Sequence, residues 1–265
     1  MTQANNSHSK KKLFTGKFTA FTLVELAVAI VVISLLMIVV AQSIKMVYTA
    51  KLTNARAVTA KSPAPNITGL SAWYEAASLD SFKANEATDN GQITTWYDIA
   101  PESIPEKKNS LSKSASAAVT YVAKGINNLP SVKFDGTDKI SASSFASGES
   151  KQNTVFFVVR SNNLNSNAAV IDSGSGTSST AIALANNGIN INSGNNVTSL
   201  ANNCCDEGKD YIIATYLNGT HSRSYINNAS RMASDSPVNP GSNPLKGISI
   251  GGDRNNSSNL NGLLS

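Results

Sequence analysis

Residues 21–40 read FTLVELAVAIVVISLLMIVV, and this segment decides how the rest of the chain is organised. Twenty residues at about 1.5 Å rise per residue form a helix about 30 Å long, which matches the hydrocarbon thickness of a bilayer. Glu25 is its only ionisable side chain, and the segment contains neither proline nor glycine. We therefore predict a membrane-spanning helix that carries one carboxylate in need of a partner.

The residues before this segment set its orientation. Lys10, Lys11, Lys12 and Lys17 lie in the first twenty residues, which contain no acidic side chain. By the positive-inside rule this flank stays cytoplasmic, so the C-terminal part lies across the membrane. Two other interpretations compete. A cleaved secretory signal peptide is disfavoured because the apolar segment is too long and no small-x-small site follows it. A plain signal anchor explains everything except Glu25 and the residues just before it.

Those residues, Thr19-Ala20-Phe21-Thr22-Leu23-Val24-Glu25, resemble the class III signal of type IV pilins and pseudopilins. The resemblance implies that a prepilin peptidase cuts between Ala20 and Phe21 and that the new amine of Phe21 is methylated. It also implies that Glu25 pairs with the N-terminal amine of a neighbouring subunit during assembly. The family usually has glycine where Ala20 stands, and Ser34 and Gln42 replace a glycine and a proline found in many major pilins.

Charge gives no reason to expect nucleic acid as a partner. The formal net charge is +5, but four of the 22 basic residues lie in the leader, which leaves 18 basic against 17 acidic residues in the remainder. The only two cysteines, Cys204 and Cys205, are adjacent. They allow a reduced pair, a vicinal disulfide or bonds to another subunit, and the reduced pair in a loop before a strand at Tyr211 is favoured.

The pattern of charged, apolar and turn-forming residues along the sequence divides the chain into four parts. We expect a cytoplasmic leader at 1–20, a helix at 21–61 with 21–41 in the membrane, a Pro-containing linker at 62–68 and a β-sandwich at 69–265. The fold class is therefore α+β, a long helix followed by an all-β antiparallel jelly roll. The expected strands, separated by turn residues such as Asn187-Gly188, are 69–74, 92–98, 118–122, 131–135, 153–160, 168–172, 180–184, 188–192, 210–217, 222–227 and 247–251.

A second resemblance covers residues 67–265. Its motifs are GLSAWY at 69–74, ITTWYD at 93–98 and LPSVKFDGTD at 129–138, and these are similar to concanavalin A-like (laminin G-like) domains of bacterial surface proteins. Such domains normally close with one more apolar strand after the segment that matches 261–264. The resemblance therefore implies either an exposed sheet edge that another subunit fills or a truncated sequence.

Candidate ligand-binding residues in this part are few. Trp73 and Trp96 offer aromatic faces for sugar rings, although core positions are favoured for both. Asp135, Asp138 and Asp253 are oxygen ligands of the kind that calcium prefers, but turn-capping roles are favoured, and no cofactor is expected. We find no strand with acids at alternate positions, and a Ser/His/Asp triad would depend on His221 alone. The sequence therefore predicts no enzyme.

Together these features predict a type IV pilin-like subunit, a minor one, with a lectin-like head for adhesion. Its expected partners are a prepilin peptidase, other pilin subunits, an inner-membrane assembly platform, membrane lipid and surface carbohydrate. The expected location is the inner membrane as a single-pass protein with a periplasmic head, then an extracellular pilus or pseudopilus. Three alternatives remain: a pseudopilin of a type II secretion system, a membrane-tethered carbohydrate-binding module and a surface glycanase.

Overall fold

A computed structural model of the chain describes most of its residues. The described ranges are 22–101, 108–114, 117–145, 150–164, 167–175, 180–194, 197–201, 204–232, 239 and 241–265. The expected leader and the cleavage position between Ala20 and Phe21 lie outside these ranges. The head contains two antiparallel sheets, so the expected class, a long helix followed by an antiparallel β-sandwich, is confirmed.

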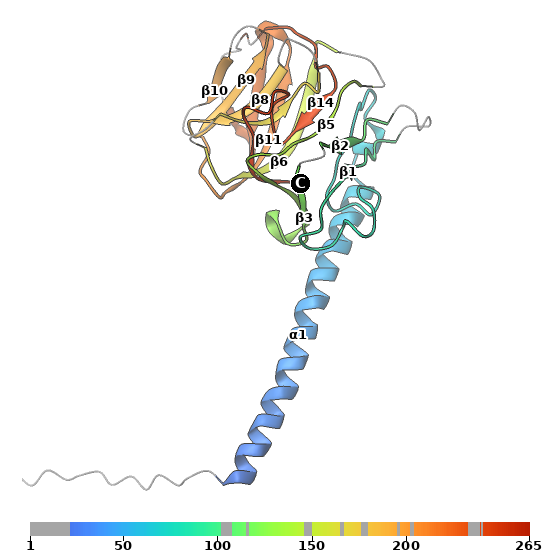
Figure 1. The fold of residues 1–265 in the computed structure, drawn as a ribbon, viewed down its shortest axis with the longest axis vertical. Coiled ribbons are helices and arrows are strands. Elements are labelled where there is room, and N and C mark those ends of the chain that lie inside the picture. Colours follow the sequence, from blue (N-terminus) through green and yellow to red (C-terminus); the bar gives the residue numbers. More distant parts are fainter. Residues whose placement is uncertain are drawn as a thin grey trace, which may run out of the picture. The chain divides into compact units, whose positions relative to one another are not determined.

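The long helix, α1, runs unbroken from Leu23 to Ala60 (Figure 1). It persists because no proline or glycine interrupts it, and it stops where Pro63 follows. The hydroxyl of Ser34 donates to the Ile30 carbonyl at 2.8 Å, so this polar group is satisfied within the helix. The helix is long and apolar enough to cross a membrane once.

The structure divides into two units, one ending at Thr49 and the other running from Ala50 to Ser265. The second unit thus includes the last turns of α1. There Lys51 Nζ donates to the Asn127 carbonyl at 2.5 Å, Arg56 Nε donates to the Ala77 carbonyl at 2.7 Å, and Thr59 Oγ1 contacts Glu75 Oε1 at 3.0 Å. These bonds fasten the end of α1 to the head. The expected linker at 62–68 contains the 3₁₀ turn η1, Ala64–Asn66.

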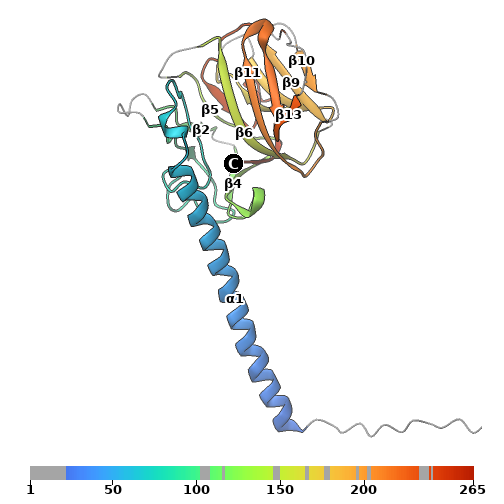
Figure 2. The same ribbon diagram turned by 180° about the vertical axis from the view of Figure 1, so that it is seen from behind.

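The head is built from two antiparallel sheets, seen from opposite sides in Figures 1 and 2. The eight-stranded sheet has the order β1-β2-β5-β14-β7-β8-β9-β10, and the seven-stranded sheet has the order β13-β12-β11-β6-β15-β4-β3. The strands are β1 Thr95–Trp96, β2 Leu111–Lys113, β3 Thr120–Val122, β4 Ser131–Asp135, β5 Ile140–Ala142, β6 Asn153–Ser161, β7 Ala168–Asp172, β8 Thr180–Ala185, β9 Gly188–Ser193, β10 Val197–Ala201, β11 Asp210–Leu217, β12 Arg223–Ile226, β13 Asn228–Met232, β14 Ile248–Ile250 and β15 Asn261–Leu264. Two further 3₁₀ turns are η3 Ile126–Asn128 and η4 Gly219–His221.

Both sheets contribute to one hydrophobic core. In β6 and β11 the buried side chains alternate with outward ones, as a half-buried strand requires. The fully buried side chains include Phe134 and Ile213 from the seven-stranded sheet and Ile182, Leu184 and Ile191 from the eight-stranded sheet. The alternation in these two strands thus reflects packing between the sheets.

Several strand predictions need correction. The segment 69–74 is not a strand, because its backbone is bonded by other groups: the Trp73 N–H donates to the Asp98 carboxylate, and the Trp73 carbonyl accepts from Ile99 N–H. Strands β2, β5, β10, β13 and β15 were not predicted. The last of these, β15, lies between β4 and β6 and pairs with both, so no empty position adjoins it within the seven-stranded sheet.

Two glycines with the same backbone angle provide a matched test of the packing. Gly69 and Gly251 both have φ +81°; a Cβ on Gly69 would meet nothing within 4 Å, whereas one on Gly251 would lie 2.1 Å from Phe134 Cδ1. We expect Gly69→Ala to cost about 1–2 kcal/mol for the left-handed backbone and Gly251→Ala to cost a further 1–3 kcal/mol or so for overpacking. Chemical denaturation measures both, and equal losses would contradict the described packing.

Candidate functional site

The N-terminus of α1 is closed by a reciprocal capping box. Thr22 is the N-cap residue, because its carbonyl accepts the Leu26 N–H at 3.1 Å. Its hydroxyl accepts the Glu25 N–H at 3.2 Å, while Glu25 Oε2 accepts the Thr22 N–H at 2.8 Å and the Thr22 hydroxyl at 2.9 Å. The Thr-x-x-Glu pattern is visible in the sequence, but this local role of Glu25 was missed.

The capping box uses only one oxygen of the Glu25 carboxylate. Both bonds end on Oε2, and among the described residues Oε1 has no hydrogen-bond partner. Around it, α1 presents apolar side chains that nothing in the described chain covers: Leu23 is 85% exposed and Val32, the most protected of the large ones between Leu23 and Val47, is 48% exposed. This arrangement suits a lipid environment or packing against similar helices, with one carboxylate oxygen left for a cation.

The two tryptophans occupy different environments. Trp96 is 2% exposed and packs against Tyr74 and Phe82, with ring centroids 5.8 and 5.7 Å away. It is therefore a core residue, and its face is not available to a sugar. Trp73 is partly buried, and its backbone N–H donates to Asp98 Oδ1 at 2.9 Å.

Asp98 is a structural hub that sequence reasoning did not identify. It is buried and accepts three backbone N–H groups: those of Trp73 and Ala100 on Oδ1, each at 2.9 Å, and that of Asn109 on Oδ2 at 3.0 Å. Its carboxylate thereby joins three segments near the start of the head.

Asp135 is the last residue of β4, and Asp138 lies in the turn between β4 and β5. Asp135 Oδ1 accepts the Thr137 N–H at 2.8 Å and its hydroxyl at 2.7 Å, as expected of a turn-capping residue, and these bonds lower the pKa of Asp135. Asp138 is 6% exposed, and its Oδ2 accepts no hydrogen bond. Burial, followed by the charge of Asp135, raises the pKa of Asp138.

The predicted consequence is opposite pH behaviour of two matched variants. Because the pKa of Asp138 is higher in the folded state than in the unfolded chain, its contribution to stability falls as the pH rises above about 3.9. Asp138→Asn, which resembles the protonated form, should therefore raise the melting temperature at pH 7, with a smaller gain at pH 4. The pKa of Asp135 is lower in the folded state than in the unfolded chain, so its contribution to stability is present above the unfolded pKa. Asp135→Asn should therefore lower the melting temperature at pH 7. Shifts in the same direction at pH 7 would contradict this account.

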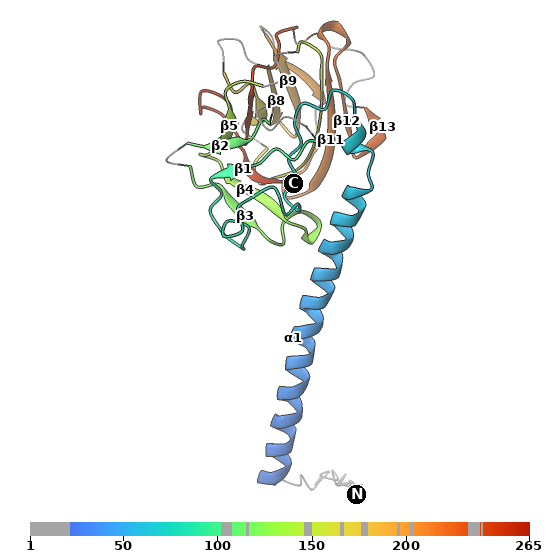
Figure 3. The same ribbon diagram turned by 90° about the vertical axis from the view of Figure 1, so that its right-hand side faces the viewer.

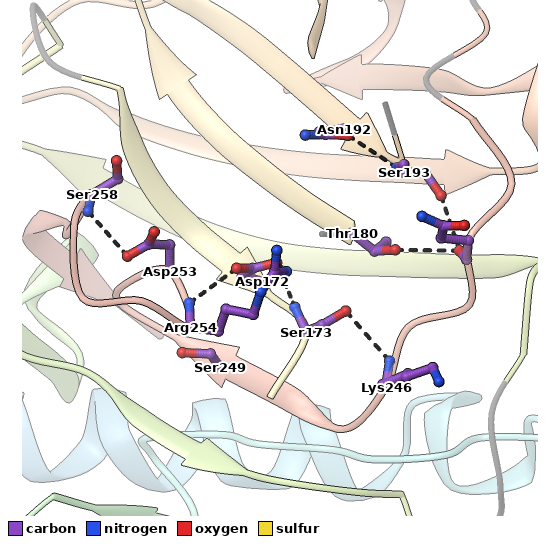
Figure 4. Close-up of polar contacts among 12 residues, drawn as sticks. Asp172, Ser173, Thr180, Asn192, Ser193, Lys246, Ser249, Asp253, Arg254 and Ser258 are labelled. Carbon is purple, nitrogen blue, oxygen red and sulfur yellow. Dashed lines mark hydrogen bonds and ion pairs between the residues drawn. The ribbon is translucent and has the colours of Figure 1, made fainter. Parts of the chain in front are cut away.

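A charged cluster fastens the loop between β14 and β15 to the eight-stranded sheet (Figure 4). The buried Asp172 accepts the Arg254 N–H on Oδ2 at 3.0 Å, and Arg254 Nη1 lies 3.5 Å from its Oδ1. Lys139 Nζ donates to the carbonyls of Asp253 and Arg254, each at 2.6 Å. Burial raises the pKa of Asp172 and lowers that of Lys139. Asp253 caps the same loop, because its carboxylate accepts Ser257 N–H at 2.6 Å.

Neighbouring hydroxyls in Figure 4 hold a second segment, residues 241–246. Thr180 Oγ1 and Ser193 Oγ both donate to the Asn243 carbonyl, at 3.2 and 3.0 Å, and Ser173 Oγ accepts Lys246 N–H at 3.4 Å. These contacts are satisfied within the chain and serve to hold the fold. Within the described ranges, no group of three His, Cys, Asp or Glu side chains is positioned to hold a metal ion.

An exposed apolar patch lies on the outer face of the seven-stranded sheet, whose strands β11, β12 and β13 are labelled in Figure 3. Phe156 of β6 is 71% exposed and Ile212 of β11 is 58% exposed. Phe156 pairs with Ala214, which pairs with Tyr225, so a small residue separates two aromatic ones in one row. The sequence contained a signal, because adjacent Phe156 and Phe157 in a strand point to opposite faces.

The two cysteines follow β10, and neither forms a disulfide. Cys205 is buried, Cys204 is partly buried, and their sulfur atoms lie 3.0 Å apart. His221 is exposed and its Nδ1 contacts the hydroxyl of Thr220 at 3.1 Å.

Comparisons with known proteins give structural likenesses only. No family model matches the chain, and no curated protein matches it. One matching solved structure is domain 4 of AbnA, an extracellular arabinanase from Geobacillus stearothermophilus in complex with arabinotriose, with 14% identity, TM-score 0.42 and coverage of 56% of this chain and 72% of that one. Trypanosoma rangeli sialidase matches in complex with sialic acid (12% identity, TM-score 0.47, 82% and 36% coverage) and with the inhibitor DANA (11%, 0.44, 82% and 35%). The chain thus spans about a third of the sialidase.

These likenesses correct one prediction. The absence of catalytic motifs predicted that the chain is not an enzyme. That prediction is wrong, because structures that match the chain come from glycoside hydrolases. The missing motifs were paired acids and a triad, which are features of particular sites rather than of a fold. At TM-scores below 0.5, the likenesses carry no argument for a substrate, a reaction or a ligand of this chain.

Proposed function

We propose that the chain is a type IV pilin-like filament subunit, anchored in the inner membrane by α1 until residues 1–20 are removed. The observation that carries the proposal is Glu25. It is the only ionisable side chain between Thr22 and Ile44, it lies in the first helical turn, and one of its oxygens has no partner among the described residues. A carboxylate in an apolar environment needs a cation, and cleavage before Phe21 would create one nearby in each subunit.

The exposed apolar surface of α1 supports the same proposal. A helix that only anchors a head needs no acidic side chain. In a helix that packs among copies of itself, one charge pair between neighbouring copies can fix how the helices are aligned. The Glu25 carboxylate of one subunit and the methylated amine of Phe21 in the next would set the axial register between subunits. The lysine-rich flank supports a cytoplasmic N-terminus and a head on the opposite side.

We further propose that the β-sandwich head has an adhesive role in a minor subunit, with surface carbohydrate as its ligand class. The resemblance of residues 67–265 to concanavalin A-like domains suggests this role. The exposed apolar patch formed by Phe156 and Ile212 supplies aromatic and aliphatic surface, and such patches mark interaction sites on soluble domains. Trp96 is excluded from that surface by its burial.

The capping box favours a second candidate, a membrane-tethered carbohydrate-binding module with an uncleaved anchor. Glu25 already has a structural role at the start of α1, so a filament partner is not required to explain the residue. A type II secretion pseudopilin would share the N-terminal features of the leading proposal.

Recovery of the protein in filaments tests the proposal. The full chain is produced in cells that assemble type IV filaments, the filaments are sheared off, and the chain is quantified in the sheared and membrane fractions. We expect it in the sheared fraction only when the prepilin peptidase is active. Retention in the membrane fraction with an active peptidase, together with glycan binding by the intact chain, would favour the tethered module.

A further inference from the structure

The pair Cys204 and Cys205 is arranged unlike two neighbours in an extended chain. The backbone N–H groups of both residues donate to a single acceptor, the carbonyl of Asn187, at 2.8 and 3.0 Å. Successive residues of a strand point their side chains to opposite faces. Here both N–H groups converge on one carbonyl, so the backbone is turned and the two sulfur atoms come within 3.0 Å of each other.

The surrounding structure holds this turn in place. The accepting carbonyl belongs to the two-residue turn between β8 and β9, where Asn186 and Asn187 have φ of +50° and +55°. Just beyond the pair, the Asp206 N–H donates to the Tyr211 hydroxyl at 2.7 Å, and the Gly208 N–H donates to the Ser161 carbonyl at 2.8 Å. The cysteines are therefore fixed between the β8–β9 turn and the start of β11.

From this convergence we infer that Cys204 and Cys205 are a redox modification site, closed as a vicinal disulfide by a protein that carries a reactive disulfide. The Cys204 thiolate attacks one sulfur of the partner's disulfide, forms a mixed disulfide and displaces the partner's other sulfur as a thiolate. Cys205 then loses its proton and attacks Cys204 Sγ, which closes the vicinal bond and releases the partner as a dithiol. Two electrons pass to the partner, and the two thiol protons pass to its sulfurs or to solvent.

The environment assigns the order of the two steps. Cys204 is partly exposed, whereas Cys205 is 2% exposed, so a partner reaches Cys204 first. The hydrogen bond that the Cys205 thiol makes with Cys204, followed by its burial, raises the pKa of Cys205, so this thiol stays protonated until the second step. A bond between adjacent residues is strained and therefore readily reduced, which suits a reversible modification.

Oxidised glutathione is the probe, used on the full chain in detergent, so the test does not depend on the proposed filament role. We expect the wild type to lose two hydrogens, about 2 Da by intact mass, to carry no glutathione and to lose both thiols to maleimide labelling. Cys205→Ser should keep a glutathione adduct on Cys204, and Cys204→Ser should react at least about tenfold more slowly because its remaining thiol is buried. A stable glutathione adduct or a covalent dimer of the wild type would overturn the inference.

Phenylarsine oxide gives a second readout that needs no variant. A trivalent arsenical bridges two close thiols, so one equivalent should bind to the reduced folded chain and protect both thiols from maleimide. Binding should be lost after treatment with oxidised glutathione and recovered with a reductant. Failure of the reduced, folded wild type to bind the arsenical would show that the two sulfurs do not act as a pair.

Discussion

Glu25→Gln is expected to reduce recovery of the chain in sheared filaments at least about 100-fold, as much as Glu25→Ala does. Glutamine keeps an oxygen that can accept the Thr22 N–H and hydroxyl, so the capping box survives. What it loses is the charge for the N-terminal amine of the neighbouring subunit, which would then be buried without a counter-ion. Quantitative blotting of the sheared and membrane fractions measures the ratio.

Thr22→Val is the matched control, because it removes the capping hydroxyl and retains the Glu25 carboxylate. The loss of an N-cap costs about 1 kcal/mol of helix stability, so recovery should fall only modestly. If Glu25→Gln assembles normally while Thr22→Val and Glu25→Ala both fail, then Glu25 acts as a helix cap and its charge has no role in assembly.

Asp98→Asn is expected to destabilise the head by about 2–4 kcal/mol, which corresponds to a fall of roughly 5–15 °C in melting temperature for a domain of this size. The carboxylate accepts the N–H groups of Trp73, Ala100 and Asn109, and an asparagine amide presents an N–H donor to at least one of them. A buried donor without an acceptor then remains. Thermal unfolding followed by circular dichroism measures the change.

Asp80→Asn makes the same chemical change at an exposed position and should alter stability by no more than about 0.5 kcal/mol. A loss for Asp98→Asn that is no larger than this control would mean that the Asp98 carboxylate does not hold the three segments together.

The fold could be predicted where local pattern and packing agree. The strands at 153–160 and 210–217 alternate because one face of β6 and one of β11 enter the core. The apolar helix needed no tertiary information at all, since length and composition define it. By contrast, β15 has four residues including Gly262, and it is a strand only because β4 and β6 flank it. The segment 69–74 has strand-forming residues, but the backbone of Trp73 is bonded to the Asp98 side chain and to Ile99 instead of forming a ladder.

The candidate sites show the same division. Glu25 could be identified as unusual from composition alone, because an acid in an apolar segment is conspicuous, but its bonds to Thr22 were read only from the structure. The sequence predicted no role for Asp98, which is part of the ITTWYD motif, because the three backbone N–H groups that donate to its carboxylate lie up to 25 residues away in the chain. The paired geometry of Cys204 and Cys205 depends on the carbonyl of Asn187, which no local pattern predicts.

Intact mass and N-terminal sequencing of the chain, produced with and without an active prepilin peptidase, test the central proposal most directly. The account predicts that the processed protein begins at methylated Phe21 and that an inactive peptidase leaves Met1 in place. Ala20→Gly should be processed at least as well, since glycine is usual there in the family that the junction resembles. A wild-type chain that keeps Met1 to Ala20 beside an active peptidase would contradict the filament-subunit account and leave the membrane-tethered module in its place.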